Sequence, residues 1–203
     1  PALSPCSRNH QDYINSMTYS IHERDGLPQE FQTLLADYPR EAWQDHPNFA
    51  ESIQHWLGAH LYFKRIGAIL TKETQLFLNK DRSVDEFGGR LGHYGNQLMQ
   101  NLHSHHHWED HDYFPELRAA DPRFDRGLDM LETDHTEMDK ILDDFTQTGN
   151  RTLKLSQLDP PKAYEEAGKL LETTQAIQSF LARHLADEED LIVPILLHHK
   201  MRG

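Results

Sequence analysis

Apolar residues recur with helical spacing through four long segments of the chain, and each segment predicts an α-helix. The expected helices cover residues 47–79, 85–117, 124–148 and 161–199. Pro47 and Pro161 stand near the starts of the first and last, where a first-turn residue needs no backbone N–H. No segment alternates apolar and polar residues with the period of a strand. The pattern therefore predicts an all-α protein.

Turn-like residues separate these helices at residues 79–83, 120–122 and 149–161, and such short connections favour antiparallel neighbours. Upstream, two short helices are expected at about residues 11–24 and 28–37, joined by Gly26-Leu27-Pro28. We therefore predict an antiparallel up-down-up-down four-helix bundle over residues 47–203, preceded by a short helical N-terminal extension over residues 1–46.

A thirteen-residue motif with the spacing H-x-x-x-E-[DE]-x-x-x-x-P-x-L occurs twice in the chain. The first copy begins at His105 and contains Glu109, and the second begins 79 residues later at His184 and contains Glu188. A weaker echo relates the surroundings of His60 to those of His135, 75 residues further on. The repeat indicates two helical hairpins of related pattern.

Helical geometry selects one histidine from the cluster at residues 103–111. When His105 is set at zero, Glu109 and the nearby leucines fall within about 60° of it, on one apolar face. His103, His106 and His107 fall at about 100° or more from His105. We expect these three to be solvated or capping residues, or to collect adventitious metal.

His60, His135 and His184 likewise share a helix face with apolar residues, and Glu188 follows His184 by one turn. Residues of antiparallel neighbours lie at the same height when they are equidistant from the turn. The midpoints between His60 and His105, between His105 and His135, and between His135 and His184 all fall in the predicted breaks. Four histidines and two glutamates can therefore converge in one layer.

Such a layer has a chemical requirement, because a buried carboxylate is costly unless it is paired or binds a metal. Lys64 is the only basic residue expected to face inward in these stretches. Two divalent cations would satisfy the whole set, with imidazoles as terminal ligands and two carboxylates as bridges. Nitrogen and oxygen ligands without thiolate suit Fe, Mn or Zn.

Composition narrows the classes of partner. The chain has 33 acidic and 20 basic residues and a net charge of −13, which repels nucleic acid phosphates, so we expect no nucleic-acid partner. The longest apolar run, residues 191–197, contains Pro194, and we expect no membrane span. Cys6 is the single cysteine, which excludes an intramolecular disulfide and a multi-cysteine metal site. The first twelve residues lack an apolar signal core, and we expect a cytoplasmic protein.

These residues resemble the hemerythrin family, specifically the bacterial hemerythrin-like domains with an HHE-type cation-binding motif. The resemblance covers about residues 47–199 and includes Pro115 and Pro194. It implies a four-helix bundle with a non-haem di-iron centre, in which two carboxylates and an oxygen ligand bridge two Fe ions; Zn or Mn are possible substitutes. The metal ligands that it implies are His60, His105, Glu109, His135, His184 and Glu188.

The chain departs from the oxygen carriers of that family at one position. Those proteins have a second histidine one turn after the residue that corresponds to His135, whereas this chain has Asp139. Asp139 is a candidate metal ligand, Glu132 competes for the role, and Lys64 could pair with either carboxylate. A carboxylate in place of an imidazole favours ferric iron and weighs against reversible oxygen carriage.

The resemblance implies O2 binding, storage or sensing, or iron, nitric oxide or peroxide chemistry. We expect a di-iron protein that binds O2 or a related small oxidant. Two alternatives stay open: a di-iron oxidoreductase acting on peroxide or nitric oxide, and an iron or zinc store or sensor without redox turnover. A ferritin-like ferroxidase fits less well, because that fold needs E-x-x-H on two helices and only residues 132–135 supply it. The sequence indicates no particular protein partner.

Overall fold

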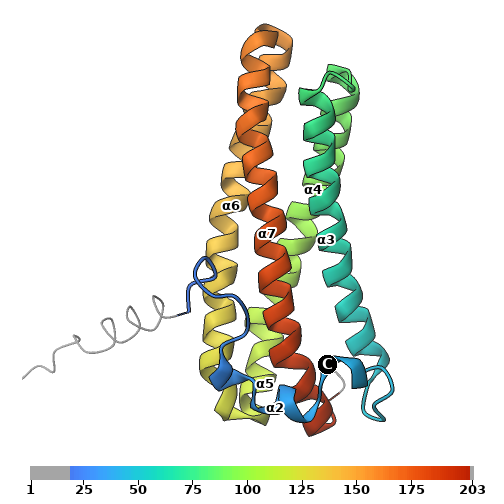
Figure 1. Ribbon diagram of the computed structural model, residues 1–203, viewed down its shortest axis with the longest axis vertical. Helices are drawn as coiled ribbons and strands as arrows, with labels where there is room; N and C mark the ends of the chain where they lie inside the picture. Colours follow the sequence, from blue (N-terminus) through green and yellow to red (C-terminus); the bar gives the residue numbers. More distant parts are fainter. Residues whose placement is uncertain (1–18, 202–203) are drawn as a thin grey trace, which may run out of the picture.

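Four long helices form the bundle in the computed structural model, which describes residues 19–201 (Figure 1). They are α3 (Glu51–Leu78), α4 (Val84–Trp108), α6 (Asp125–Leu158) and α7 (Pro160–His199). The hairpins α3–α4 and α6–α7 turn at the same end of the molecule. Helix α7 packs against α6 and α3, and α4 packs against α3 and α6, so the four helices close around one interior. The predicted all-α bundle is confirmed.

Local signals explain why both hairpins turn sharply. Ser83 caps α4 by accepting a hydrogen bond from the backbone N–H of Glu86, and the Glu86 side chain accepts one from the Ser83 backbone in return. Asp159 alone connects α6 to α7, and its side chain accepts from the N–H of Lys162. The Asp159 turn lies at the sequence midpoint of His135 and His184, as their predicted common height requires.

The third predicted helix, residues 124–148, is too short, and the turn predicted from Gly149 is wrong. Helix α6 continues to Leu158. A Cβ on Gly149 would lie 3.7 Å from Leu91 and 3.9 Å from Leu170, so neighbouring helices pack closely around this residue. Tertiary packing outweighs the helix-propensity cost of a glycine, which is about 1 kcal/mol.

The second predicted helix, residues 85–117, is interrupted. Helix α4 ends at Trp108, a π-helical turn follows at Glu109–Tyr113, and α5 covers Phe114–Ala120. The N–H of Phe114 donates to the carbonyl of Glu109, five residues back rather than four. Single π-helical turns inside α-helices occur frequently at functional sites. This turn begins with one of the two predicted bridging carboxylates.

The N-terminal segment wraps around the bundle at the end opposite the hairpin turns (blue in Figure 1). It contains 3-10 turns at Gln29–Phe31 and Arg40–Ala42 and the short helix α2 (Thr33–Asp37), which packs against α7. The helix predicted over residues 28–37 is therefore present as two short pieces. Most of the helix predicted over residues 11–24 lies outside the described residues, and residues 20–24 form a turn.

The interior consists of two apolar clusters with a polar layer between them. The cluster near the N-terminal segment includes Trp56, Tyr113, Leu131 and Leu191. The cluster toward the hairpin turns includes Phe63, Leu102, Met138 and Leu181. On α3, α6 and α7 the inward-facing histidines lie between members of the two clusters, and those of α4 lie between Leu102 and Tyr113 of the π-helical turn. Both sides of the polar layer are therefore covered by apolar side chains. Among the described helices, none is long and apolar enough to cross a membrane.

Candidate metal centre

Seven polar side chains from the four long helices and the π-helical turn meet in this layer. They are His60 of α3, His105 and His106 of α4, Glu109 of the π-helical turn, His135 of α6, and His184 and Glu188 of α7. They form two groups, in each of which the potential ligand atoms all lie within 4.8 Å of one another. The three-histidine group consists of His106, His135 and His184. The mixed group consists of His60, His105, Glu109 and Glu188.

The carboxylate of Glu109 lies between the two groups. Its Oε1 is 2.9 Å from Nε2 of His105 in the mixed group, and its Oε2 is 3.7 Å from Nε2 of His135 in the three-histidine group. Oε1 also accepts a 2.8 Å hydrogen bond from the indole N–H of Trp56. Burial by itself would raise the pKa of Glu109, but the contact with His105 outweighs it and the pKa is lowered. Glu109 is therefore an anion that faces both groups.

Glu188 occupies an equivalent place on the other side of the layer. Its Oε2 lies 3.4 Å from Nε2 of His60 and 3.9 Å from Nε2 of His184, one imidazole from each group. Burial, and then the negative charge of Glu109, raise the pKa of Glu188 well above its ordinary value. Without a cation between the two carboxylates, burial and the charge of Glu109 therefore favour the protonated form of Glu188. Both glutamates are placed to bridge two ions.

Carboxylates outside the layer orient three of the inward imidazoles. In each case Nδ1 of the ring lies within hydrogen-bond distance of a carboxylate oxygen. The pairs are His60 with Glu189 at 3.1 Å, His135 with Asp110 at 2.7 Å, and His184 with Asp134 at 3.1 Å. An Nδ1–H that donates to a carboxylate leaves Nε2 without a proton and aimed inward, as in metal-binding histidines generally.

The buried atoms without a hydrogen-bond partner test whether this site fits a metal. Among the described residues, the buried side-chain atoms without a hydrogen-bond partner include Nε2 of all five histidines of the layer, Nδ1 of His106, Oε2 of Glu109 and both side-chain oxygens of Glu188. An unpartnered buried polar group costs about 1–3 kcal/mol, so a concentration of them in one layer needs an explanation. A cation at each group would satisfy them, and nitrogen and oxygen donors without sulfur suit Fe, Mn or Zn. The residues present therefore fit a pair of metal ions.

Burial also holds the imidazoles in the form that binds metal. Desolvation, reinforced by the charge that His135 and His184 can carry, lowers the pKa of His106 well below its ordinary value. Desolvation likewise lowers the pKa of His60 and of His184, against the opposing effect of their carboxylate partners. These rings are neutral near pH 7, and only a neutral imidazole can coordinate a cation.

His106 is the site residue that the sequence prediction missed. The prediction that it is solvated or capping is wrong, because the residue is only 4% exposed and its ring stacks on that of His135. The error came from taking His105 as the centre of the buried face. The buried leucines lie at about 20–60° from His105 toward His106, so the face is centred between the two histidines. Angles measured from these leucines would have placed both His105 and His106 on the buried face. The leucines are Leu91, Leu98 and Leu102.

The structure brings together all the predicted ligands except Asp139. The Asp139 side chain lies on the exposed surface of α6, in a shallow groove with Met99, and belongs to neither group. The buried face of α6 includes Asp134 and Met138, so His135 stands at one edge of it. Asp139 comes one turn after His135 and is rotated by about a further 40° away from the centre of this buried face. Its side chain therefore faces solvent.

The competing candidates are also engaged elsewhere. Oε1 of Glu132 accepts a 2.9 Å hydrogen bond from the guanidinium of Arg118. Lys64 lies 3.3 Å from Oε1 of Glu189, rather than beside Asp139 or Glu132 as proposed from the sequence. Lys64 thus supports a carboxylate that contacts His60, and it does not neutralise the layer itself.

A groove of about 1070 Å³ between α3 and α4 leads to the mixed group. Aromatic side chains line it, among them Trp56, Trp108 and Tyr113, and His105 of the mixed group is also a lining residue. His105 is the partly exposed member of the layer, whereas the members of the three-histidine group are buried. A small molecule can therefore approach the mixed group from this side.

This arrangement defines a class of protein: a helical bundle whose interior holds paired groups of imidazole and carboxylate ligands. The model of one family, the hemerythrin HHE cation binding domain, matches residues 51–196, from the start of α3 to near the end of α7. The chain therefore belongs to the hemerythrin HHE cation-binding family, as the resemblance of its motifs indicated. Comparison with curated proteins and with solved structures gave no match.

Proposed function

We propose that the chain is a non-haem di-iron protein that binds O2 or a related small oxidant. In this proposal, one iron is held by the mixed group and the other by the three-histidine group. The observation that carries the proposal is the placement of the two carboxylates, since Glu109 and Glu188 each face an imidazole of both groups. Carboxylates in such positions are suited to bridging a pair of ions.

The two groups offer unequal numbers of ligands, which supports a role in binding a small molecule. The three-histidine group supplies three imidazoles and the mixed group supplies two, His60 and His105, while the bridging carboxylates are shared. An ion at the mixed group would therefore keep more open coordination positions, and it is also the ion that the aromatic groove reaches. Iron bound there would supply the redox chemistry, while the chain orients the imidazoles, keeps them neutral and limits access of water.

His106 changes the expectation about oxygen carriage. The argument against reversible binding rested on Asp139 as an anionic replacement for an imidazole. Because His106 supplies the third imidazole from α4 and Asp139 lies outside the layer, the ligand set stays rich in neutral nitrogen. Such a set favours ferrous iron, and we propose that O2 binding at this centre is reversible.

A second candidate function is a di-iron oxidoreductase acting on peroxide or nitric oxide. A chain of aromatic contacts from the site to the surface favours it. Trp56 donates to Glu109, and its ring lies 6.1 Å from that of Tyr113, which stacks on the exposed Trp108 at 4.6 Å. Rings in such a series are suited to carrying electrons to the buried site from a donor at the surface, as repeated turnover would require.

Metal analysis combined with an optical spectrum tests these proposed functions. The protein is loaded anaerobically with ferrous iron, exposed to O2 and then depleted of O2. We expect two irons per chain and a spectral change that O2 removal reverses. A single irreversible oxidation would contradict O2 carriage, and sustained consumption of peroxide or nitric oxide would favour the oxidoreductase. Zinc in the native protein, with no visible spectrum in the iron form, would instead indicate a metal store or sensor.

A further inference from the structure

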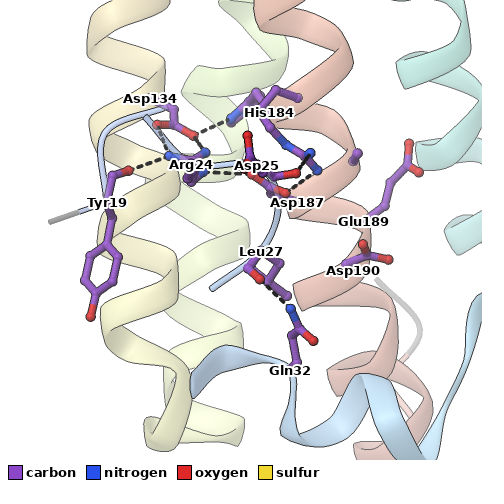
Figure 2. A network of polar contacts seen from close by, with 12 residues as sticks. Tyr19, Arg24, Asp25, Leu27, Gln32, Asp134, His184, Asp187, Glu189 and Asp190 are labelled. Atoms are coloured by element: carbon purple, nitrogen blue, oxygen red, sulfur yellow. Dashed lines mark hydrogen bonds and ion pairs between the residues drawn. The ribbon is translucent and has the colours of Figure 1, made fainter. Parts of the chain in front are cut away.

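The N-terminal segment places a buried arginine, Arg24, against Asp134, the carboxylate that contacts His184 of the three-histidine group (Figure 2). The Arg24 side chain is only 7% exposed. Its two terminal nitrogens donate to the carboxylate of Asp134, and its Nε donates to Asp187 at 2.8 Å. Asp134 lies on α6 and Asp187 on α7, so one guanidinium from outside the bundle joins two of its helices.

Asp134 also contacts a histidine of the polar layer. Its Oδ2, which also contacts Arg24, lies 3.1 Å from Nδ1 of His184. Arg24, Asp134 and His184 therefore form a continuous series from the N-terminal segment to the inward-facing Nε2 of an imidazole. Because Arg24 holds both oxygens of Asp134, the carboxylate cannot rotate away from the ring.

A second series of the same kind reaches the mixed group. Nη1 of Arg40 donates to Oε2 of Glu189 at 2.7 Å, and Oε1 of Glu189 lies 3.1 Å from Nδ1 of His60. Arg40 is further fixed by Asp190, whose Oδ1 accepts from its Nε at 2.5 Å, and by the carbonyl of Ala186. Each group thus contains one imidazole whose carboxylate partner is held by an N-terminal arginine.

We propose that residues 24–40, the strap, position the metal ligands of both groups through Arg24 and Arg40. The inference rests on the proposed metal-binding function and assigns a role to the segment that precedes the bundle. Partners of metal-bound histidines typically contribute about 10–100-fold to metal affinity, because they fix the tautomer and the orientation of the ring. We expect Arg24 to matter more than Arg40, because Arg40 is 42% exposed and Glu189 keeps Lys64 as a second cation.

Two strap variants and one matched control test the proposal in the full chain. Arg24→Lys retains the positive charge but lacks the planar fork that reaches both Asp134 and Asp187. Arg40→Gln removes the guanidinium from Glu189 at a partly exposed position. The control is Arg126→Gln, because Arg126 contacts Tyr19 and, within the strap, Glu30, but neither Asp134 nor Glu189.

Competition between the protein and a chelator for Co²⁺ gives the affinity of each ion, and the Co²⁺ absorption spectrum reports the geometry of the ligands. We expect Arg24→Lys to lower the affinity for one of the two Co²⁺ ions by about tenfold or more and to change the absorption spectrum. Arg40→Gln should lower the affinity for the other ion by a smaller factor. Arg126→Gln should have the affinities and the spectrum of the wild type. Melting temperatures of the metal-free forms separate this role from simple support of the fold.

Variants that melt earlier but bind both ions with wild-type affinity and spectrum would overturn the positioning role. If Arg24→Lys does not fold, Arg40→Gln alone decides, with unchanged binding counting against the proposal. A wild-type protein that binds no pair of ions would instead contradict the proposed function, and so the two failures are distinguishable.

Discussion

The imidazole of His106 lies parallel to that of His135, with ring centroids 3.9 Å apart and an angle of 10° between the planes. The two residues come from α4 and α6, and neither Nε2 has a hydrogen-bond partner. Two stacked imidazolium ions would repel each other at this distance, so the contact requires at least one neutral ring. The stack joins α4 to α6 within the three-histidine group and supplies the imidazole that Asp139 does not.

The first prediction concerns this contact. His106→Ala should lose the ion of the three-histidine group and retain the ion of the mixed group, because only two imidazoles would remain at the first. His107 is the next residue along α4, and its side chain is exposed. His107→Ala should therefore bind both ions as the wild type does. Metal content after dialysis against a weak chelator measures both. Loss of metal in His107→Ala with full retention in His106→Ala would show that the assignment of α4 is wrong.

The second prediction concerns the free energy that the polar layer costs the metal-free protein. Glu188→Met should raise the stability of the metal-free protein by about 1–3 kcal/mol, because it removes a buried polar group without a partner. It should also abolish the rise in melting temperature on metal addition, which for the wild type at 100 times Kd corresponds to about 2.7 kcal/mol. Thermal unfolding with and without metal checks both effects. Glu137→Met on the surface of α6 is the control and should keep the metal-dependent rise.

The third prediction concerns the pH dependence of the metal-free protein. His60, His106 and His184 have lowered pKa values in the folded state, so below about pH 6.5 the unfolded chain binds protons that the folded chain does not. Stability should therefore fall as the pH drops below about 6.5, by up to about 1.4 kcal/mol per pH unit for each histidine. Glu188, whose pKa is raised in the folded state, acts in the opposite direction and offsets part of this fall. Urea unfolding at pH 7.5 and 5.5 measures the difference.

His106→Gln should reduce this pH dependence, because it removes one of the three rings whose pKa is lowered. His103→Gln is the matched control, since His103 is exposed on the same helix. An equal slope in all three proteins would show that the buried histidines are not responsible for the acid sensitivity.

The fourth prediction concerns the aromatic groove. A Cβ on Gly58 would meet no atom within 4 Å, so Gly58→Leu should project into the groove without disturbing the bundle. We expect slower binding of azide to the iron-loaded protein with unchanged metal content, together with a gain of up to about 1 kcal/mol in helix stability. Gly89→Leu has the same open surroundings on α4 but is not part of the groove. It should give the stability gain and leave the azide rate unchanged.

Much of the fold and of the layer could be predicted because the relevant signals are periodic. The doubled motif and the midpoints between histidines depend only on spacing along helices, and they place His60, His105, His135 and His184 at one height. The length of α6 was missed because Gly149 was weighed by its local preference, whereas close packing against neighbouring helices determines its structure. His106 was missed because a single residue, rather than the average of the buried positions, was taken as the centre of a helix face.

The strap could not be predicted in the same way. Arg24 is 110 residues from Asp134, and Arg40 is 149 residues from Glu189. No periodicity connects a turn outside the bundle with a buried carboxylate inside it. The doubled motif places an acidic residue directly after Glu109 and after Glu188, but nothing in the motif identifies which cations contact these side chains.

The polar layer also has a consequence for how the molecule unfolds. It separates the interior into one apolar cluster beside the N-terminal segment and another toward the hairpin turns, and the four long helices run through both. Apolar contacts couple residues within each cluster, whereas across the layer the metal-free protein has charges and unpartnered polar atoms. Cooperativity between the two halves therefore depends on what occupies the layer. Amide hydrogen exchange should reveal two separately opening units without metal and a single unit when metal bridges them.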